Sequence, residues 1–434
     1  MPEEVATYVA AVCRGLTKAG VAASAKHFPG HGDTHVDSHL SLPIIHKDAS
    51  ALARIDLVPF RTASDAHAAT IMIGHMALPA VTGDNTPASL SRAIISDMLR
   101  GSLEYNGVAV TDCLEMGAVA AREGGVPQAA VQALQAGADI AMICHGFDRQ
   151  RNAVEAAYSA LRSGTLDQGQ ILASGRRIAA LKDAFAGNWD QVLGTMFDEA
   201  GWARLKAENA ALSRQAYASG IALVRNPDDV IPLPKSKTSE SRGITIVLTP
   251  RMGLLNPVMA GTGASTAAPS GRREMRIAAA GPTYLSFAAG VSKRVNGASL
   301  HDVYSSEEPL SAEVGDAIDR GLASSVLFVT RNADRAVWQL DRLREVLRRV
   351  GKKGSRRLDK VVVLASYGPY DLLRSAPSPL VGEEGMGLDE VGYVACFEPT
   401  PEALDAAAAV IFGEEGARGK VPVCGGNVLA GNDS

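Results

Sequence analysis

The sequence predicts an α/β protein built from two domains, and three observations support this prediction. Its 434 residues are enough for about two or three domains of ordinary size. Short apolar runs alternate with helical patterns along both halves, which is typical of parallel strands connected by helices. Hydrophobic residues make up 46% of the chain and charged residues 21%, values that exclude chain-wide disorder.

The first half of the chain follows a strand, loop and helix order. It begins in a predicted amphipathic helix, with Pro2 in the first turn and Gly20 after the end. The apolar residues of this helix recur at helical spacing: Val5, Tyr8, Val9, Val12 and Leu16. Four apolar runs are predicted strands that end in polar residues: Val21–His27, Ala69–His75, Val108–Asp112 and Ala138–Cys144. Later helices are expected at Ala129–Gly137, Arg151–Gly164 and Gln168–Phe185.

The second half repeats the alternation of apolar runs and helices. A connecting helix is expected at roughly Trp202–Ser219, and a later helix at Trp338–Val350. The predicted strands are Ile244–Leu248, Ser325–Thr330, Lys360–Ala365, Tyr393–Phe397 and Ala408–Phe412. We therefore expect a first domain at residues 1–190, a connecting helix or linker at 191–219 and a second α/β domain at 220–434.

Charge and composition exclude several classes of partner. The 43 Lys and Arg residues are balanced by 47 Asp and Glu, a net charge of −4 without any basic block. This balance argues against binding of nucleic acid or of an anionic membrane surface. No apolar run approaches the roughly 18 residues that span a bilayer, and the chain opens without a secretory pattern, so a cytoplasmic location is expected.

The five cysteines do not form a recognisable framework. Cys13, Cys113, Cys144, Cys396 and Cys424 are odd in number, widely separated and without a CxxC pair. A disulfide framework or a zinc site built from such spacing is therefore not expected.

Residues 26–39, KHFPGHGDTHVDSH, concentrate ionisable groups after the first predicted strand. Four histidines recur every fourth residue: His27, His31, His35 and His39. On a helix this spacing would place them on one face as metal ligands, but Pro29, Gly30 and Gly32 favour a loop. We therefore expect a loop and no metal; a metal site and a solvated polar loop remain as alternatives.

This segment, followed by Leu42-Pro43, is similar to the signature of glycoside hydrolase family 3, in its β-N-acetylglucosaminidase branch. Further segments resemble that family in the same order: Ile71–Ala80, Ser89–Arg100, Gly107–Met116, Ala130–Met142, Gly220–Pro234 and Val410–Val423. The resemblance implies the C-terminal part of a (β/α)8 TIM barrel, with about four βα units, followed by an α/β/α sandwich domain.

The resemblance also implies an activity and its residues. The expected enzyme is a retaining exo-glycosidase that hydrolyses terminal β-linked N-acetylglucosamine through a covalent glycosyl-enzyme. Asp112 is the implied nucleophile, and His39, assisted by Asp37, is the implied acid/base, a role that suits an imidazole near neutral pH. Lys26 and His27 are the implied sugar-binding residues. A small carbohydrate is the expected partner, and no metal or organic cofactor is expected.

The neighbouring side chains are given other roles. His31 and Asp33 are expected to brace the loop rather than to touch substrate. His75 is left open between the lining of the pocket and a satisfied structural histidine. A cysteine nucleophile at Cys113 is rejected, since alternation along the strand would turn it away from Asp112.

The resemblance implies that the first half of the barrel lies outside this chain. Three interpretations are compatible with this: a fragment, a barrel completed by a second chain, and a non-catalytic relative. The intact catalytic residues favour the fragment. A sugar-binding pseudoenzyme and a phosphorylase acting on the same glycosides remain as alternative functions, and the oligomeric state is left open.

Overall fold

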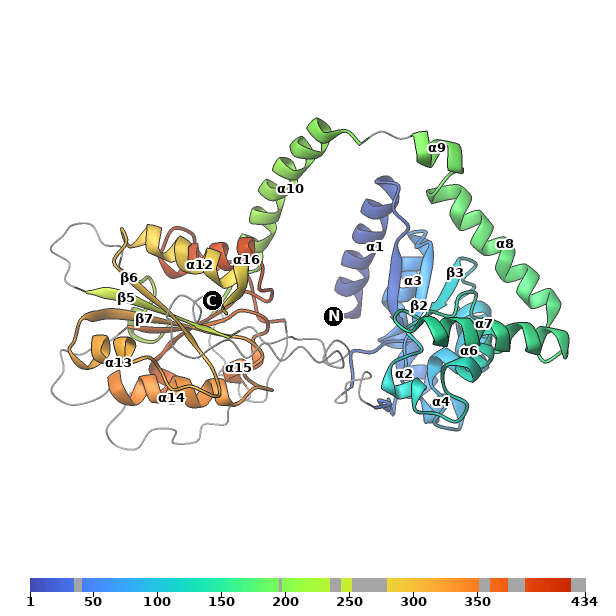
Figure 1. Cartoon of the computed structure of the whole chain (residues 1–434), viewed down its shortest axis with the longest axis horizontal. Coiled ribbons are helices and arrows are strands. Elements are labelled where there is room, and N and C mark those ends of the chain that lie inside the picture. The colour runs from blue at the N-terminus through green and yellow to red at the C-terminus, as the bar shows by residue number, and fades with distance from the viewer. Residues whose placement is uncertain are drawn as a thin grey trace. The chain divides into compact units, whose positions relative to one another are not determined.

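The computed structural model describes residues 1–34, 41–194, 197–234, 243–251, 279–350, 360–373 and 387–422. The chain forms two compact units, Met1–Phe197 and Asp198–Ser434, which are coloured from blue to green and from green to red in Figure 1. Among the residues in these ranges, no helix is both long enough and apolar enough to cross a membrane.

The first unit contains a short parallel sheet and the helices around it. Its elements in chain order are α1 (Pro2–Lys18), β1 (Ser24–Phe28), α2 (Ala49–Arg54), α3 (Leu57–Asp65), β2 (Thr70–Ile73), α4 (Pro79–Thr82), η1 (Ala88–Leu90), η2 (Ala93–Ser102), β3 (Val108–Thr111), α5 (Gly117–Ala120), α6 (Gly125–Ala136), α7 (Phe147–Arg162), α8 (Gln168–Phe185) and α9 (Trp189–Gly194). The strand order is β1-β2-β3, with both pairs parallel. This confirms three of the four predicted strands.

The fourth predicted strand, Ala138–Cys144, is wrong as a strand. Only Ile140 pairs with β3, through a single parallel bridge to Val110. Side chains replace the ladder on both sides of this bridge: the Asp139 carboxylate accepts from the Ala109 N–H, and the Thr111 hydroxyl accepts from the Met142 N–H. The segment therefore follows the edge of β3 in the expected direction without forming a regular strand.

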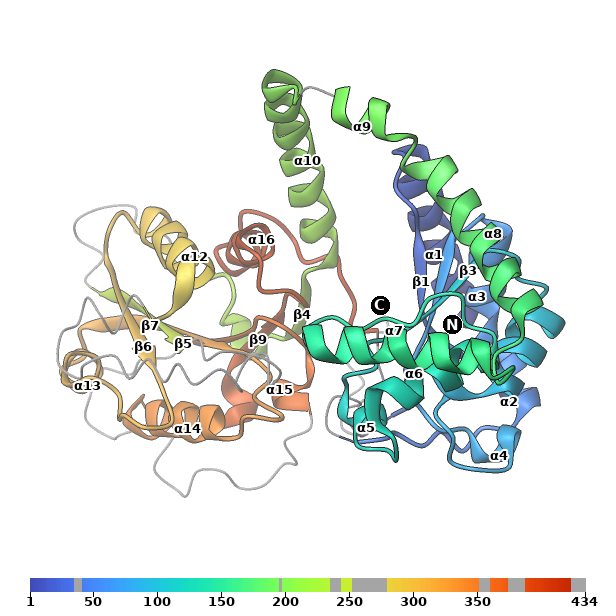
Figure 2. The same ribbon diagram turned by 45° about the vertical axis from the view of Figure 1, so that its right-hand side comes forward.

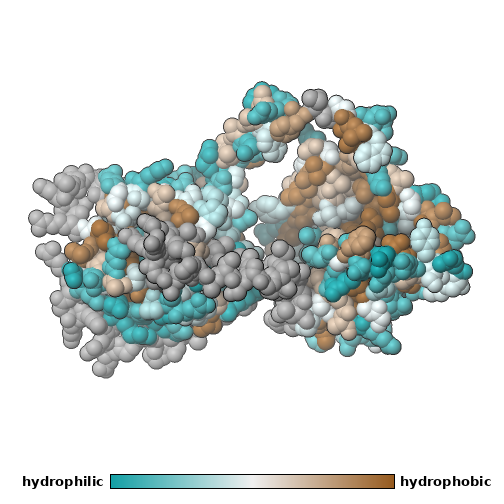
Figure 3. Space-filling model, viewed as in Figure 1, coloured by the Kyte–Doolittle hydropathy of each residue, from teal (hydrophilic) through white to brown (hydrophobic). Residues whose placement is uncertain are grey.

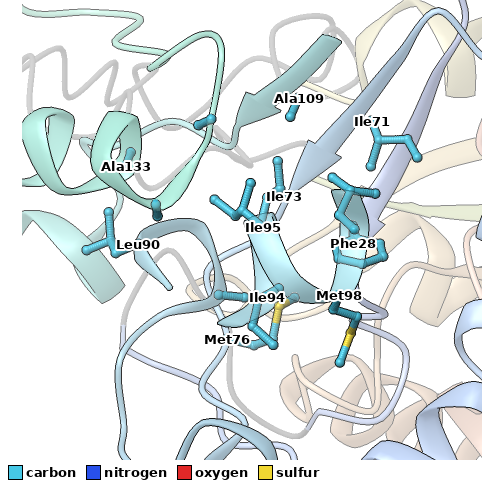
Figure 4. Packing of buried hydrophobic residues seen from close by; sticks show 14 of the residues in the cluster. Phe28, Ile71, Ile73, Met76, Leu90, Ile94, Ile95, Met98, Ala109 and Ala133 are labelled. Atoms are coloured by element: carbon cyan, nitrogen blue, oxygen red, sulfur yellow. The ribbon is translucent and has the colours of Figure 1, made fainter. Parts of the chain in front are cut away.

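The core of the first unit lies between the sheet and the helices that follow it. Phe28 of β1, Ile73 of β2 and Ala109 of β3 are fully buried. They belong to one apolar cluster with Ile94 and Ile95 of η2, as Figure 4 shows. Burial of such side chains contributes about 25 cal/mol for each Å² removed from water, so this cluster fixes the position of the strand ends.

Helix α1 is confirmed, but its larger apolar side chains lie on its exposed face. It packs on the unit through small residues, Ala6, Ala10 and Cys13, and lies beside β1 in Figure 2. Tyr8 is 75% exposed and Val12 59%. Brown hydrophobic residues gather over the first unit in Figure 3, in agreement with these exposed fractions.

The second unit is a six-stranded sheet between two helical layers. Its elements are α10 (Glu199–Gly220), β4 (Ala222–Arg225), η3 (Pro227–Asp229), β5 (Ile244–Pro250), α12 (Gly281–Arg294), β6 (Ser299–Tyr304), α13 (Ala312–Asp319), β7 (Ala323–Thr330), α14 (Trp338–Val350), β8 (Val361–Ala365), α15 (Tyr370–Leu373), η4 (Leu388–Glu390), β9 (Gly392–Ala395) and α16 (Pro401–Ile411). The order is β4-β9-β8-β7-β5-β6, and only the β4–β9 pair is antiparallel. Helices α12 and α16 cover one face and α13 and α14 the other, which is the expected α/β/α sandwich (Figure 1).

One predicted strand of this unit is wrong. The run Ala408–Phe412 is the last part and the end of α16, whose N-cap Thr400 accepts from the Ala403 N–H. The alanines of this run favour a helix. Because this end of the helix is buried, it carries only apolar residues, and a short apolar run also resembles a buried strand. Two strands were not predicted, β4 and β6; the polar pair His301 and Asp302 interrupts the apolar pattern of β6.

Candidate active site

The candidate site of the first unit lies where its parallel strands end. His27 is in the last part of β1, and Asp112 directly follows β3. Because β1, β2 and β3 run in the same direction, their carboxyl ends share one edge of the sheet. The register of the strands therefore brings together two side chains that are 85 positions apart in the printed sequence.

The structure places His27 next to Asp112. The His27 Nε2 atom lies 3.5 Å from Asp112 Oδ2, and the side chains are 30% and 17% exposed. The other carboxylate oxygen, Oδ1, accepts a hydrogen bond of 2.8 Å from the Cys113 backbone N–H. Asp112 is thus held at both oxygens while it remains partly open to solvent, as a reacting carboxylate requires.

Glycine at position 74, at the end of β2, makes room for this contact. A Cβ atom added to Gly74 would lie 2.9 Å from the Cβ of His27. This separation is shorter than real carbon–carbon contacts allow, so a larger residue would displace His27. The absence of a side chain at the middle strand lets His27 reach across toward Asp112.

The other predicted site residues are placed only in part. Lys26 is exposed on β1, beside His27. Asp37 and His39 lie outside the described residues, as does His35, so the distance from the expected acid/base to Asp112 is not among the described contacts. Two of the four histidines in the metal alternative, His35 and His39, are therefore outside the described residues.

The beginning of the histidine-rich loop is braced in the way the sequence predicts. The Thr34 hydroxyl lies 3.0 Å from His31 Nδ1, and the His31 ring lies 6.0 Å from the His27 ring, centre to centre. Lys47 is 3.4 Å from Asp33 and 3.0 Å from Asp56. Burial opposes the charge of Lys47, but these two carboxylates outweigh it and raise the Lys47 pKa.

His75 is a satisfied structural histidine, which answers a question the sequence left open. It is fully buried, with Nε2 2.9 Å from the Cys113 carbonyl and Nδ1 2.7 Å from the Ser89 hydroxyl. A carbonyl only accepts, so Nε2 carries the hydrogen and Nδ1 accepts from Ser89. Burial lowers the His75 pKa, which favours this neutral form. His75 therefore fixes the backbone of the residue after Asp112.

Sequence reasoning missed a buried ion cluster at the opposite end of β3. The Asp139 side chain is fully buried and accepts from Arg100 at 2.6 Å, Ser174 at 2.6 Å and Arg177 at 2.8 Å. Its Oδ2 also accepts from the Ala109 N–H at 2.9 Å. The cluster ties η2 and α8 to the start of β3. The only signal in the sequence was an aspartate inside the apolar run of residues 138–144.

Sequence reasoning also missed Glu115, which links two loops at the carboxyl edge of the sheet. Its Oε2 accepts from the N–H groups of Cys144 and His145 at 2.9 and 2.7 Å, and its Oε1 accepts from Gly146 at 2.9 Å. Burial would raise the pKa of this carboxyl. The backbone donors and Arg149 outweigh burial and lower the pKa to about 2.

A separate cavity of about 670 Å³ lies in the second unit. It is lined by Arg331, Tyr367, Phe397, Glu398, Pro399 and Thr400. These residues follow the carboxyl ends of β7, β8 and β9, the usual ligand edge of such a sheet. None of the sequence-predicted site residues contributes to it.

The first unit is similar in sequence to proteins of known families. Residues 1–181 match the family described as "Glycosyl hydrolase family 3 N terminal domain". A curated β-hexosaminidase of Stenotrophomonas maltophilia is 39% identical over 144 residues, which are 33% of this chain and 42% of that protein. The chain thus matches about two fifths of the length of this relative.

Two solved structures resemble nearly the whole chain. A fungal multi-domain GH3 β-N-acetylglucosaminidase is 32% identical with a TM-score of 0.78, covering 99% of this chain and 44% of the other. A family 3 β-N-acetylglucosaminidase from Paenibacillus is 28% identical with a TM-score of 0.72, covering 94% and 68%. Residues 1–181 therefore match the glycosyl hydrolase family 3 N-terminal domain, and the whole chain resembles solved family 3 β-N-acetylglucosaminidases in fold.

Proposed function

We propose that the protein is a glycoside hydrolase that releases terminal β-linked N-acetylglucosamine with retention of configuration. The observation that carries this proposal is the partly exposed Asp112 carboxylate at the end of β3, held 3.5 Å from His27. The similarity of this chain to proteins named β-hexosaminidase and β-N-acetylglucosaminidase supports the same substrate class. No metal or organic cofactor takes part in the proposed reaction.

Asp112 is the proposed nucleophile. Asp112 follows β3, and the buried residues Ala109 and Leu114 on either side of it belong to the apolar core, which fixes the backbone at Asp112. The Cys113 N–H and the His27 ring hold its two oxygens, and this leaves the carboxylate oriented before substrate arrives. Such orientation lowers the entropy cost of attack on the anomeric carbon. The attack forms the covalent glycosyl-enzyme that retention requires.

His39 is the proposed acid/base, with Asp37 as its partner. The protonated imidazole can donate its proton to the leaving oxygen, and the neutral imidazole that results can then remove a proton from water. A carboxylate on the other ring nitrogen stabilises the charged ring and fixes its tautomer. Lys26 and His27 are the proposed donors to the sugar hydroxyls. His27 then has two tasks, because it also contacts Asp112.

Turnover of an aryl β-N-acetylglucosaminide by the purified chain tests the proposal. We expect Asp112→Asn and His39→Ala each to lower kcat/KM by about 10³-fold or more. Asp97→Asn is the matched control, since Asp97 is an exposed carboxylate on η2, and it should leave turnover unchanged.

Three results would favour other functions. A folded chain that binds N-acetylglucosamine without turnover would indicate a sugar-binding protein. Formation of a sugar 1-phosphate only when inorganic phosphate is present would indicate a phosphorylase. A bound metal that is essential for activity and is lost in His35→Ala but retained in His145→Ala would favour a metal centre in the histidine-rich loop. Each of these results would contradict the proposed hydrolysis mechanism.

A further inference from the structure

We propose that the loop after β3 and the turn before α7 form a binding site for a thiophilic divalent cation of the zinc class. The proposed ligands are Cys113 Sγ, the Glu115 carboxylate and His145 Nδ1, with a water molecule as the fourth donor. The site goes beyond the proposed function, because hydrolysis of the glycoside uses no metal. None of its proposed ligands belongs to residues 26–39.

The three ligand atoms are already close to the spacing that one ion requires. His145 Nδ1 lies 3.2 Å from Glu115 Oε2, and Cys113 Sγ lies 3.8 Å from the same oxygen. All three atoms lie within 4.8 Å of one another. A tetrahedral zinc ion with bonds of about 2.0 Å to N and O and about 2.3 Å to S separates its ligands by about 3.3–3.5 Å. Small rotations of the side chains would therefore suffice.

The donor set fits zinc better than calcium or magnesium. Thiolate and imidazole are preferred ligands of zinc, whereas calcium and magnesium take oxygen ligands. Cys144 lies at the same turn, where its backbone N–H donates to Glu115 Oε2. Cys113 is buried and Cys144 exposed, so an ion reaches the cluster from the solvent side.

The supporting contacts of the carboxylate are already in place. Backbone N–H groups of Cys144, His145 and Gly146 fix Glu115, as outer contacts do in established metal sites. Arg149 lies 3.1 Å from Oε1, whereas His145 Nδ1 and Cys113 Sγ both approach Oε2, so the ion would bind at Oε2. On binding, the Cys113 thiol proton and any proton on the ligating nitrogen of His145 leave to solvent.

The ligands come from two loops that are about thirty positions apart in sequence. This separation explains why cysteine spacing did not predict the site: neither half contains a CxxC motif. Because Cys113 follows Asp112, a bound ion would hold the residue after the proposed nucleophile. The ion would act as a brace of this loop, not as a participant in the reaction.

Direct metal binding by the full chain tests the proposal. Metal-free protein is titrated with Zn²⁺ against a chromogenic competitor, and with Co²⁺ by absorption spectroscopy. We expect one ion per chain and a thiolate-to-cobalt charge-transfer band. Cys113→Ser and His145→Ala should each weaken binding by at least about tenfold. Two control variants, Cys13→Ser and His46→Ala, should bind as the unmodified chain does, since both residues lie outside the cluster.

Absence of stoichiometric zinc in the unmodified chain would overturn the proposal. Unchanged affinity in both Cys113→Ser and His145→Ala, or a cobalt spectrum without thiolate bands, would also overturn it. His145 is exposed, so His145→Ala decides the matter if the buried Cys113→Ser variant does not fold by circular dichroism. Asp112→Asn should still bind zinc, because its amide oxygen can accept from the Cys113 N–H. This separates a failure of the site from a failure of the proposed hydrolase.

Discussion

Asp112 Oδ2 lies 3.5 Å from His27 Nε2, so a residue that follows β3 is in contact with a residue of β1, across the end of the strand between them. The middle strand permits this contact because it continues into Gly74, where any Cβ would meet His27. The candidate nucleophile is therefore oriented by a feature of the sheet itself. The orientation of Asp112 therefore depends in part on Gly74, which makes room for His27.

Gly74→Ala tests this relationship. The new Cβ would lie 2.7 Å from the flexible end of Met76, which can move, and 2.9 Å from the Cβ of His27, so it should displace the imidazole from its contact with Asp112. We expect kcat for an aryl β-N-acetylglucosaminide to fall roughly 10–100-fold while the fold is retained. The control is Gly175→Ala in α8, where a Cβ meets nothing within 4 Å. Equal activity of the two variants would show that His27 does not orient the nucleophile.

His75→Ala should destabilise the first unit by about 2–3 kcal/mol at pH 7.5, because it leaves the Cys113 carbonyl and a buried cavity behind. Burial lowers the His75 pKa below its ordinary value of 6.5. The stability it contributes is therefore present above about pH 6.5 and is lost as the pH falls. Urea unfolding at pH 7.5 and pH 5 should show a smaller difference between the two proteins at pH 5. A difference that grows toward acid would contradict the neutral, buried histidine.

Asp139→Asn should be among the most damaging single changes in the first unit. The variant leaves Arg100 and Arg177 facing a neutral amide in a buried site. Removing one partner of such a cluster costs about 3–5 kcal/mol. The shift is measured as a lower urea midpoint, compared with the exposed carboxylate variant Asp97→Asn. A shift of the same size in both variants would show that the cluster contributes nothing specific.

Asp371 gives the second unit a pH dependence of opposite sign. Burial raises its pKa from 3.8 to about 6, even though the Ala333 N–H donates to its Oδ1 at 2.8 Å. The stability it contributes is present below about pH 4 and is lost as the pH rises through about 6. Asp371→Asn should therefore stabilise the unit by about 3 kcal/mol at pH 8 relative to its effect at pH 4.

The control for this prediction is Asp316→Asn, an exposed carboxylate of α13 whose ion pair with Arg320 is worth little. Urea unfolding of both variants at pH 4 and pH 8 makes the comparison. A stabilisation by Asp371→Asn that does not depend on pH would contradict a buried carboxyl with a raised pKa.

Much of the fold could be predicted because the strands carry simple apolar runs. Val108–Asp112 differs by one residue from β3, and the parallel order followed from the helices between strands. The errors arise where side chains replace backbone pairing or where alanine makes a helix look like a strand. Asp139 and Thr111 prevent a regular fourth strand, and Ala408–Phe412 belongs to α16.

The site could be predicted only where residues adjoin strand ends. The family resemblance implies His27 and Asp112 as site residues, and the structure places them 3.5 Å apart at the shared edge of parallel strands. Glu115, His145 and Ser89 could not be predicted, because their partners are set by loops from distant parts of the sequence. Asp37 and His39 lie outside the described residues, so their role stays a prediction.

The central claim is that the Asp112 carboxylate forms a covalent bond with the sugar. An activated, fluorinated N-acetylglucosaminide that accumulates the glycosyl-enzyme, followed by proteolysis and mass spectrometry, tests it most directly. The account predicts a single labelled peptide whose modified residue is Asp112, and no label in Asp112→Asn. A label on any other side chain, or turnover with inversion of configuration at the anomeric carbon, would contradict it.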